Sequence, residues 1–145
     1  MRLKRSLSAG LWLMLLLAGW LPHPTLARDS LYQRLGGEAG VAHIARDSVA
    51  LWLADDRIKA DFDNINLDRL RTRLTDQICQ LTDGPCVYHG RSMQASHAGL
   101  DLTQAKFNAV AEDLQTAMER IGIPYWTQNQ LMALLAPMQR HVVTK

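Results

Sequence analysis

Three kinds of pattern are missing from this 145-residue sequence. No segment of useful length alternates between apolar and polar residues, which argues against a β-sheet. The one long apolar run, Leu11 to Trp20, is shorter than the ~20 residues that a helix needs to span a bilayer. No internal repeat or low-complexity linker divides the chain. The sequence therefore indicates one helical domain preceded by a short apolar segment.

The first 27 residues have the pattern of a secretory signal peptide. Arg2, Lys4 and Arg5 form a basic start, the apolar run follows, and the segment ends at Ala27. We expect cleavage there, export to the periplasm or the exterior, and a mature domain of residues 28–145. The alternative is an uncleaved membrane anchor. Because the apolar run is short, the sequence favours cleavage and predicts no stable membrane insertion of the mature chain.

The charge of the mature domain is almost balanced. The leader contains three basic residues and no acidic one, so its removal leaves 13 Lys and Arg against 14 Asp and Glu, a net charge of −1. Nucleic acids and anionic membrane surfaces attract strongly basic proteins. The sequence therefore predicts neither of them as a partner.

Apolar residues recur at helical spacing along the mature chain. The pattern predicts helices over residues 40–53, 67–81 and 103–121, with Asp83-Gly84-Pro85 and Gly122-Ile-Pro124 as the stops after the second and third. Thr127 to Gln130 fits a capping box that would start a last helix. That helix carries the apolar residues Leu131, Leu134, Leu135, Met138 and Val142. The predicted fold class is all-α.

The order of several short motifs resembles a known family. In these motifs Phe62 and His97 stand 35 residues apart, and Phe107 follows His97 by 10. Together the motifs resemble a truncated haemoglobin, most closely group I, over nearly all of residues 30 to 143. They are Leu31 to Glu38 with its Gly36-Gly37 pair, Leu53 to Ile58, Phe62, Gly84-Pro85, Tyr88 to Gly90, Met93, Ser96 to Leu100, Phe107 and Gly122 to Pro124.

The resemblance implies a shortened globin fold, a two-over-two helical sandwich around haem. It implies that His97 is the proximal iron ligand and that its other ring nitrogen is held by a backbone carbonyl or similar acceptor. It assigns Arg73 and Tyr88 to the haem propionates. The remaining side chains that it places around the haem are apolar: Phe62, Leu70, Leu74, Met93, Phe107 and Leu114.

Each of these residues also has an ordinary structural interpretation. Leu70, Leu74, Phe107 and Leu114 would be core residues in almost any helical domain, Met93 is a generic gap-filler, and Arg73 is a typical solvated side chain. Only the separation of Phe62 and His97, within a match over the whole domain, favours haem.

The expected distal side is apolar, unlike that of the family. Group I members usually place a tyrosine 13 positions before the haem-packing phenylalanine, with a glutamine on the facing helix, and this chain has Val49 there with Leu70 and Leu74 opposite. A hydrogen bond to a charged group contributes roughly 1.5 to 3 kcal/mol. We therefore expect weak oxygen binding and relatively better binding of carbon monoxide and nitric oxide. Gln77 is the only nearby polar side chain that could reach into this distal pocket, although the sequence somewhat favours a position along the helix surface.

Cys79 and Cys86, the only cysteines, favour a disulfide. Export would take them to an oxidising compartment, and closing the loop between them contributes about 2.5 kcal/mol in the chain-entropy description. The alternative is two thiols, with Cys79 buried as a small apolar residue. The spacing is not Cys-x-x-Cys-His, so the expected cofactor is a non-covalent haem b with its iron.

Three classes of function remain open. The first is a globin that reversibly binds a diatomic gas, namely oxygen, nitric oxide or carbon monoxide. The second is a haem enzyme for nitric oxide or peroxide detoxification with an unidentified redox partner, which would lack the usual distal acid, base or donor. The third is a helical binding module without haem, against which His97 and Phe62 argue. The sequence favours the first, and a protein that is not an enzyme.

Overall fold

The computed structural model describes residues 29–145, and the predicted leader lies outside the described residues. The described chain contains helices and no strand, which confirms the all-α prediction. The longer helices are α2 (Gly37–Ala54), α3 (Leu67–Leu81), α5 (Gln104–Arg120) and α6 (Tyr125–Leu135). Shorter elements connect and extend them: α1 (Leu31–Arg34), η1 (Lys59–Phe62), α4 (Met93–His97), η2 (Ala136–Met138) and α7 (Gln139–Val142).

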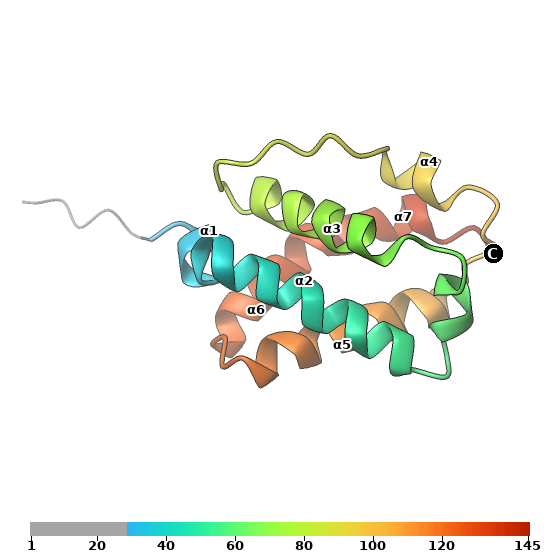
Figure 1. Cartoon of the computed structure of the whole chain (residues 1–145), viewed down its shortest axis with the longest axis horizontal. Coiled ribbons are helices and arrows are strands. Elements are labelled where there is room, and N and C mark those ends of the chain that lie inside the picture. Colours follow the sequence, from blue (N-terminus) through green and yellow to red (C-terminus); the bar gives the residue numbers. More distant parts are fainter. Residues whose placement is uncertain (1–28) are drawn as a thin grey trace, which may run out of the picture.

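The long helices form two pairs around a common core (Figure 1). Helix α2 packs on both α3 and α5, and α6 with its extension α7 packs on α5. The main core joins α1, α2, α3, α5 and α6, and its fully buried side chains include Leu35, Ile44, Ile78, Met118 and Leu131. A second cluster lies toward the other end of α2. Helices α3 and α5 both contact α2 but hardly touch one another.

Local capping residues explain where four of the helices begin. The side chains of Ser30, Asn66, Ser92 and Thr103 each accept a hydrogen bond from a backbone N–H in the first turn of the helix that follows. Helix α3 ends before Asp83, which adopts a left-handed φ of 61°. The bounds predicted for residues 67–81 are therefore correct, and those predicted for residues 103–121 differ by one residue at each end.

The prediction for the last helix was wrong in two respects. Helix α6 begins at Tyr125, directly after Pro124, so Thr127 lies inside its first turn, where the side chain is buried rather than capping. The helix then stops at Leu135, because Pro137 has no backbone N–H to donate and its ring clashes with the preceding turn. Met138 and Val142 thus lie in separate short elements, η2 and α7.

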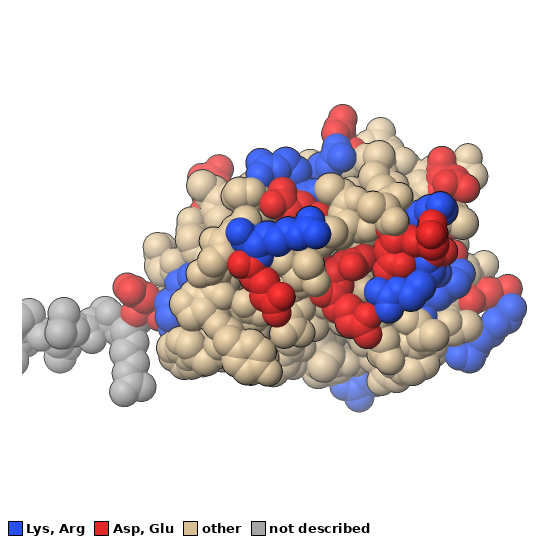
Figure 2. Space-filling view, turned by 90° about the horizontal axis from the view of Figure 1, so that it is seen from below, with Lys and Arg blue, Asp and Glu red and all other residues tan. Residues whose placement is uncertain are grey.

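Charges of both signs are interspersed on the face that Figure 2 shows, with no extended patch of one sign. Arg57 pairs with Asp55 at 2.7 Å and with Glu112 at 2.6 Å, and so connects the end of α2 to α5. The hydrogen bonds from Arg57 lower the pKa of Asp55. Such exposed pairs contribute at most about 1 kcal/mol each. No helix in residues 29–145 is long and apolar enough to cross a bilayer.

The turn between α1 and α2 depends on glycine. Gly36 and Gly37 adopt φ values of 93° and 61°, the left-handed region that glycine tolerates best. Gly40 lies in the first turn of α2, where a Cβ atom would stand 2.0 Å from the carbonyl oxygen of Leu35. The two helices therefore approach closely only because position 40 has no side chain.

Gly40→Ala is expected to lower the free energy of unfolding by about 1–3 kcal/mol, the usual cost of overpacking. The sign of this change in the free energy of unfolding distinguishes a close approach from open space, since a Gly to Ala change in an open helix normally stabilises by up to about 1 kcal/mol. Urea denaturation followed by circular dichroism measures the difference. Gly122→Ala, which meets no atom within 4 Å but has a φ of 76°, serves as a control for backbone strain alone. A Gly40→Ala protein more stable than the wild type would contradict the close approach.

Candidate functional site

His97 presents one ring nitrogen as a free ligand. It is the last residue of α4, and its Nδ1 lies 2.7 Å from the carbonyl oxygen of Met93, one turn earlier. Because a carbonyl only accepts, Nδ1 carries the proton, and Nε2 keeps the lone pair that binds a metal. In residues 29–145 no three His, Cys, Asp or Glu side chains gather to hold a bare metal ion. A single imidazole nitrogen of this kind is how many haem proteins hold the iron of their cofactor.

Phe62 is held in place by a tryptophan. Its ring stacks on that of Trp52, with the centroids 5.6 Å apart and the planes 14° from parallel. Trp52 in turn donates from Nε1 to the carbonyl oxygen of Val110, at 3.1 Å. These contacts join η1, α2 and α5, so the position of Phe62 is determined by three elements.

Several apolar side chains at this end of the domain remain partly accessible. Leu70 and Leu74 on α3, Met93 on α4 and Phe107 on α5 are only half-buried, although leucine and phenylalanine on inward helix faces are normally covered. Since α3 and α5 do not cover one another, the side chains leave apolar surface for a flat hydrophobic group. The residues present thus fit haem. Leu114 differs, because it belongs to the main core.

The three residues predicted for the distal side come together. Val49 is fully buried, and Leu70 and Leu74 pack against the cluster that contains it, the second cluster noted above. All three side chains are apolar. The neighbouring Ser48 donates its hydroxyl to the carbonyl oxygen of Ile44, at 2.7 Å, within its own helix. Because Nε1 of Trp52, which also belongs to the cluster, already donates to Val110, the cluster offers no free side-chain hydrogen-bond donor.

Gln77 is the polar residue predicted for the distal side, and its amide contacts two sulfur atoms. Its Nε2 lies 3.5 Å from Sδ of Met93 and 3.3 Å from Sδ of Met138. The assignment of Gln77 to the distal side stays a prediction.

The two residues assigned to the propionates already have polar partners. Arg73 is half-buried and pairs with Asp76 at 3.5 Å. Tyr88 donates its hydroxyl to the carbonyl oxygen of Arg91, at 2.9 Å. The assignment of Arg73 and Tyr88 to propionates stays a prediction.

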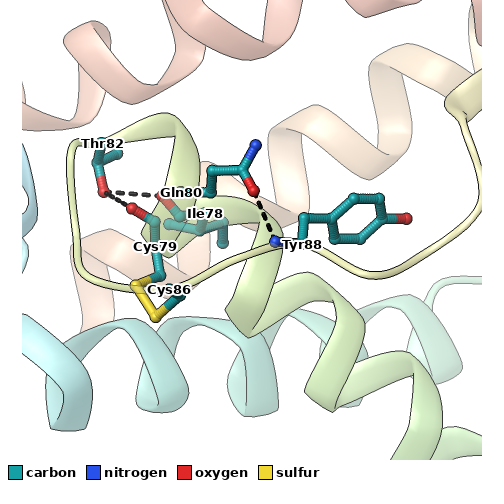
Figure 3. Close-up of a disulfide and its surroundings, with 6 residues drawn as sticks. All are labelled: Ile78, Cys79, Gln80, Thr82, Cys86 and Tyr88. Carbon is teal, nitrogen blue, oxygen red and sulfur yellow. Dashed lines mark hydrogen bonds between the residues drawn. A yellow bond between two sulfur atoms is a disulfide. The ribbon is translucent and has the colours of Figure 1, made fainter.

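A segment that we call the strap, residues 82–92, connects α3 to α4 and runs back along α3 (Figure 1). A disulfide joins Cys86 in the strap to Cys79 on α3, as the sequence analysis favours (Figure 3). The backbone N–H of Tyr88 donates to Oε1 of Gln80, at 2.6 Å. The strap that leads to His97 is thus attached to α3 at two points.

Comparison with known proteins identifies the class of the fold. The family model for the bacterial-like globins matches residues 30–144. The group 1 truncated haemoglobin of Nostoc sp. is 33% identical over 96 residues, which are 66% of this chain and 80% of the relative. That of Mycolicibacterium paratuberculosis is 27% identical over 115 residues, 79% of this chain and 85% of the relative.

Solved structures of truncated haemoglobins have the same fold as this chain. The truncated haemoglobin of Tetrahymena pyriformis in its Fe(III) form superposes with a TM-score of 0.78 at 26% identity, covering 81% of this chain and all of that one. The 2/2 haemoglobin of a Synechococcus, which has a covalently attached haem, gives a TM-score of 0.76 at 25% identity over the same shares.

The chain is therefore a globin with the two-over-two fold. It belongs to the bacterial-like globin family, as a truncated haemoglobin of group I. Proteins of this family bind haem and diatomic gases, and haem with its iron is the cofactor of this chain.

Sequence reasoning missed two residues of the site. Trp52 lies four and eight residues after Ser48 and Ile44 on the buried face of α2, so helical spacing was a signal that could have found it. Met138 had no such signal, because its contact with Gln77 joins residues 61 positions apart.

Cys86→Ser is expected to lower the free energy of unfolding by about 2.5 kcal/mol, because the unfolded chain then gains the entropy of an open loop. Denaturation in urea with and without a reductant measures the effect. The reductant should destabilise the wild type by a similar amount and leave Cys86→Ser unchanged. If the reductant shifts neither protein, the disulfide contributes nothing to stability.

Proposed function

We propose that this truncated haemoglobin ligates its haem iron through Nε2 of His97 and reversibly binds a diatomic gas on the opposite side, with a low affinity for oxygen. The hydrogen bond from Nδ1 of His97 to the carbonyl of Met93 is the observation that carries the proposal. It orients the ring and, in the neutral imidazole, places the proton on Nδ1, so that Nε2 is the nitrogen available to the iron.

Haem, when bound, would supply the iron that binds the gas, with His97 holding the iron and the predicted distal side facing the gas. Val49, Leu70 and Leu74 supply the apolar surroundings there and exclude water. A ligand that becomes negatively polarised gains roughly 1.5 to 3 kcal/mol from a hydrogen bond, or about one to two decades of affinity. Without such a donor, oxygen loses this contribution, whereas carbon monoxide loses little. The chain therefore favours carbon monoxide and nitric oxide.

A related protein supports the assignment of these positions. Solved variants of the Tetrahymena pyriformis truncated haemoglobin replace one tyrosine by phenylalanine and two glutamines by glutamate. The glutamines follow the tyrosine by 21 and 25 positions, which are also the separations of Leu70 and Leu74 from Val49. The three polar residues of that protein thus correspond to three apolar residues of this chain.

We also propose that the protein is exported as a non-covalent haem b protein. The sequence of residues 1–27 supports export, and the Cys79–Cys86 disulfide suits an oxidising compartment. Mass spectrometry of the protein made in its natural cell should give a chain that begins at Arg28. A mass that includes residues 1–27 would show that the leader is retained.

Purified protein with haem is expected to show a strong Soret band that shifts on reduction and addition of carbon monoxide. His97→Ala should remove or greatly weaken this band, because the iron loses the imidazole ligand that we propose. His43→Ala is the matched control, since His43 lies on α2 and pairs with Asp47 at 3.1 Å, away from the site. An unchanged spectrum in His97→Ala would disprove the ligation.

Val49→Tyr is expected to slow oxygen dissociation by about 10- to 100-fold, the equivalent of one hydrogen bond to a polarised ligand. Val49→Phe is the matched control, because it adds the same ring without the hydroxyl. Stopped-flow measurement of oxygen release compares the two variants, and carbon monoxide release should differ little between them. Equal oxygen release from the Tyr and Phe variants would mean that a missing donor is not what weakens oxygen binding.

A further inference from the structure

Gln77 is a polar residue on the apolar face of α3. It lies one turn after Leu74 and next to the buried Ile78, and it is itself half-buried. Its side-chain nitrogen has two protons to donate, and the two acceptors nearest to it are the sulfur atoms of Met93 and Met138, at 3.5 and 3.3 Å. An amide on an inward face is costly unless it is hydrogen-bonded, so these contacts hold its side chain in one direction.

Met93 is also the residue that orients His97. It is the first residue of α4, and its carbonyl oxygen accepts the hydrogen bond from Nδ1 of His97. A helix of five residues is not stable by itself and depends on what surrounds it. The contact of Gln77 with the side chain of Met93 therefore acts on the same residue whose backbone holds the imidazole ring.

Met138 connects Gln77 to the part of the chain on which α4 packs. It ends η2, directly before α7, and α7 is the element on which α4 packs. In residues 29–145, Gln77 makes the only side-chain hydrogen bonds that connect α3 with α4 and η2. Gln77 thus connects α3 to α4 and to η2. His97 belongs to α4, and η2 leads directly into α7, on which α4 packs.

We infer that Gln77 is a positioning residue for His97, through which the helix on the ligand side also controls the proximal side. The inference rests on the proposed ligation by His97 and adds a residue that affects the orientation of its imidazole ring. Groups that orient a metal-binding histidine typically change metal affinity 10- to 100-fold when they are removed. Since Gln77 acts through Met93 and does not touch the imidazole, we expect an effect at the lower end, about tenfold.

The test compares Gln77→Leu with Gln130→Leu in the full-length protein loaded with haem. Leucine keeps much of the volume of glutamine and removes the amide. Gln130 is the matched control, because it is a half-buried glutamine on α6 that accepts a hydrogen bond from Arg34 on α1 and does not bond the strap or α4. The readouts are the iron–histidine stretching band of the ferrous protein in resonance Raman and the rate of haem transfer to an excess of apomyoglobin.

Gln77→Leu should shift or broaden the iron–histidine band and release haem about ten times faster, whereas Gln130→Leu should keep the band position of the wild type. An unshifted band in Gln77→Leu, or an equal shift in both variants, would overturn the inference. A wild type without any iron–histidine band would instead refute the proposed ligation by His97, and the inference with it.

Met93→Leu tests the route of the effect and does not depend on the folding of Gln77→Leu. It removes the sulfur acceptor and keeps the backbone carbonyl, so it should shift the band in the same direction. If Gln77 acts through Met93, the double variant Gln77→Leu/Met93→Leu should release haem no faster than the more affected single variant. Rates that multiply would show two independent effects and overturn the inference.

Discussion

The hydrogen bond from His97 to the carbonyl of Met93 is the constraint on which the site depends. It joins two residues of one short helix, so it forms whenever α4 forms, and it determines which ring nitrogen remains free. The helix itself has five residues and is stabilised by α7 and by its connection to α3. The proposed ligation of iron by His97 thus relies on a local bond whose geometry is maintained by distant parts of the chain.

The two sides of the site use opposite physical means. On the proximal side, polar contacts determine the direction of one imidazole. On the distal side, Val49, Leu70 and Leu74 form an apolar surface that provides no donor. The stacked pair of Trp52 and Phe62 borders this surface and fixes it relative to α5. In the function that we propose, the chain selects among gases by withholding a hydrogen bond, so the ligands that need a donor least are favoured.

The predicted helix bounds were correct where capping or stop residues next to the helix determine them. The bounds of α3 were correct because Asn66 caps its first turn and Asp83 leaves helical geometry just after it ends. The last helix was predicted wrongly because the apolar spacing continues through Pro137, whose missing N–H ends the helix. Pro124 also starts α6 earlier than Thr127 suggested, and burial of Thr127 decides its role.

The sequence by itself determined the family, the separation of Phe62 from His97 and the apolar character of Val49, Leu70 and Leu74, because residue types and spacings along helices are properties of the chain. Only the tertiary structure decided the direction of Gln77 and the stacking partner of Phe62. The amide of Gln77 contacts Met138, 61 positions away, and Trp52, which stacks on Phe62, donates to the carbonyl of Val110, 58 positions away. Helical periodicity places a residue on a face of its own helix, but only packing determines which side chain of another helix it meets.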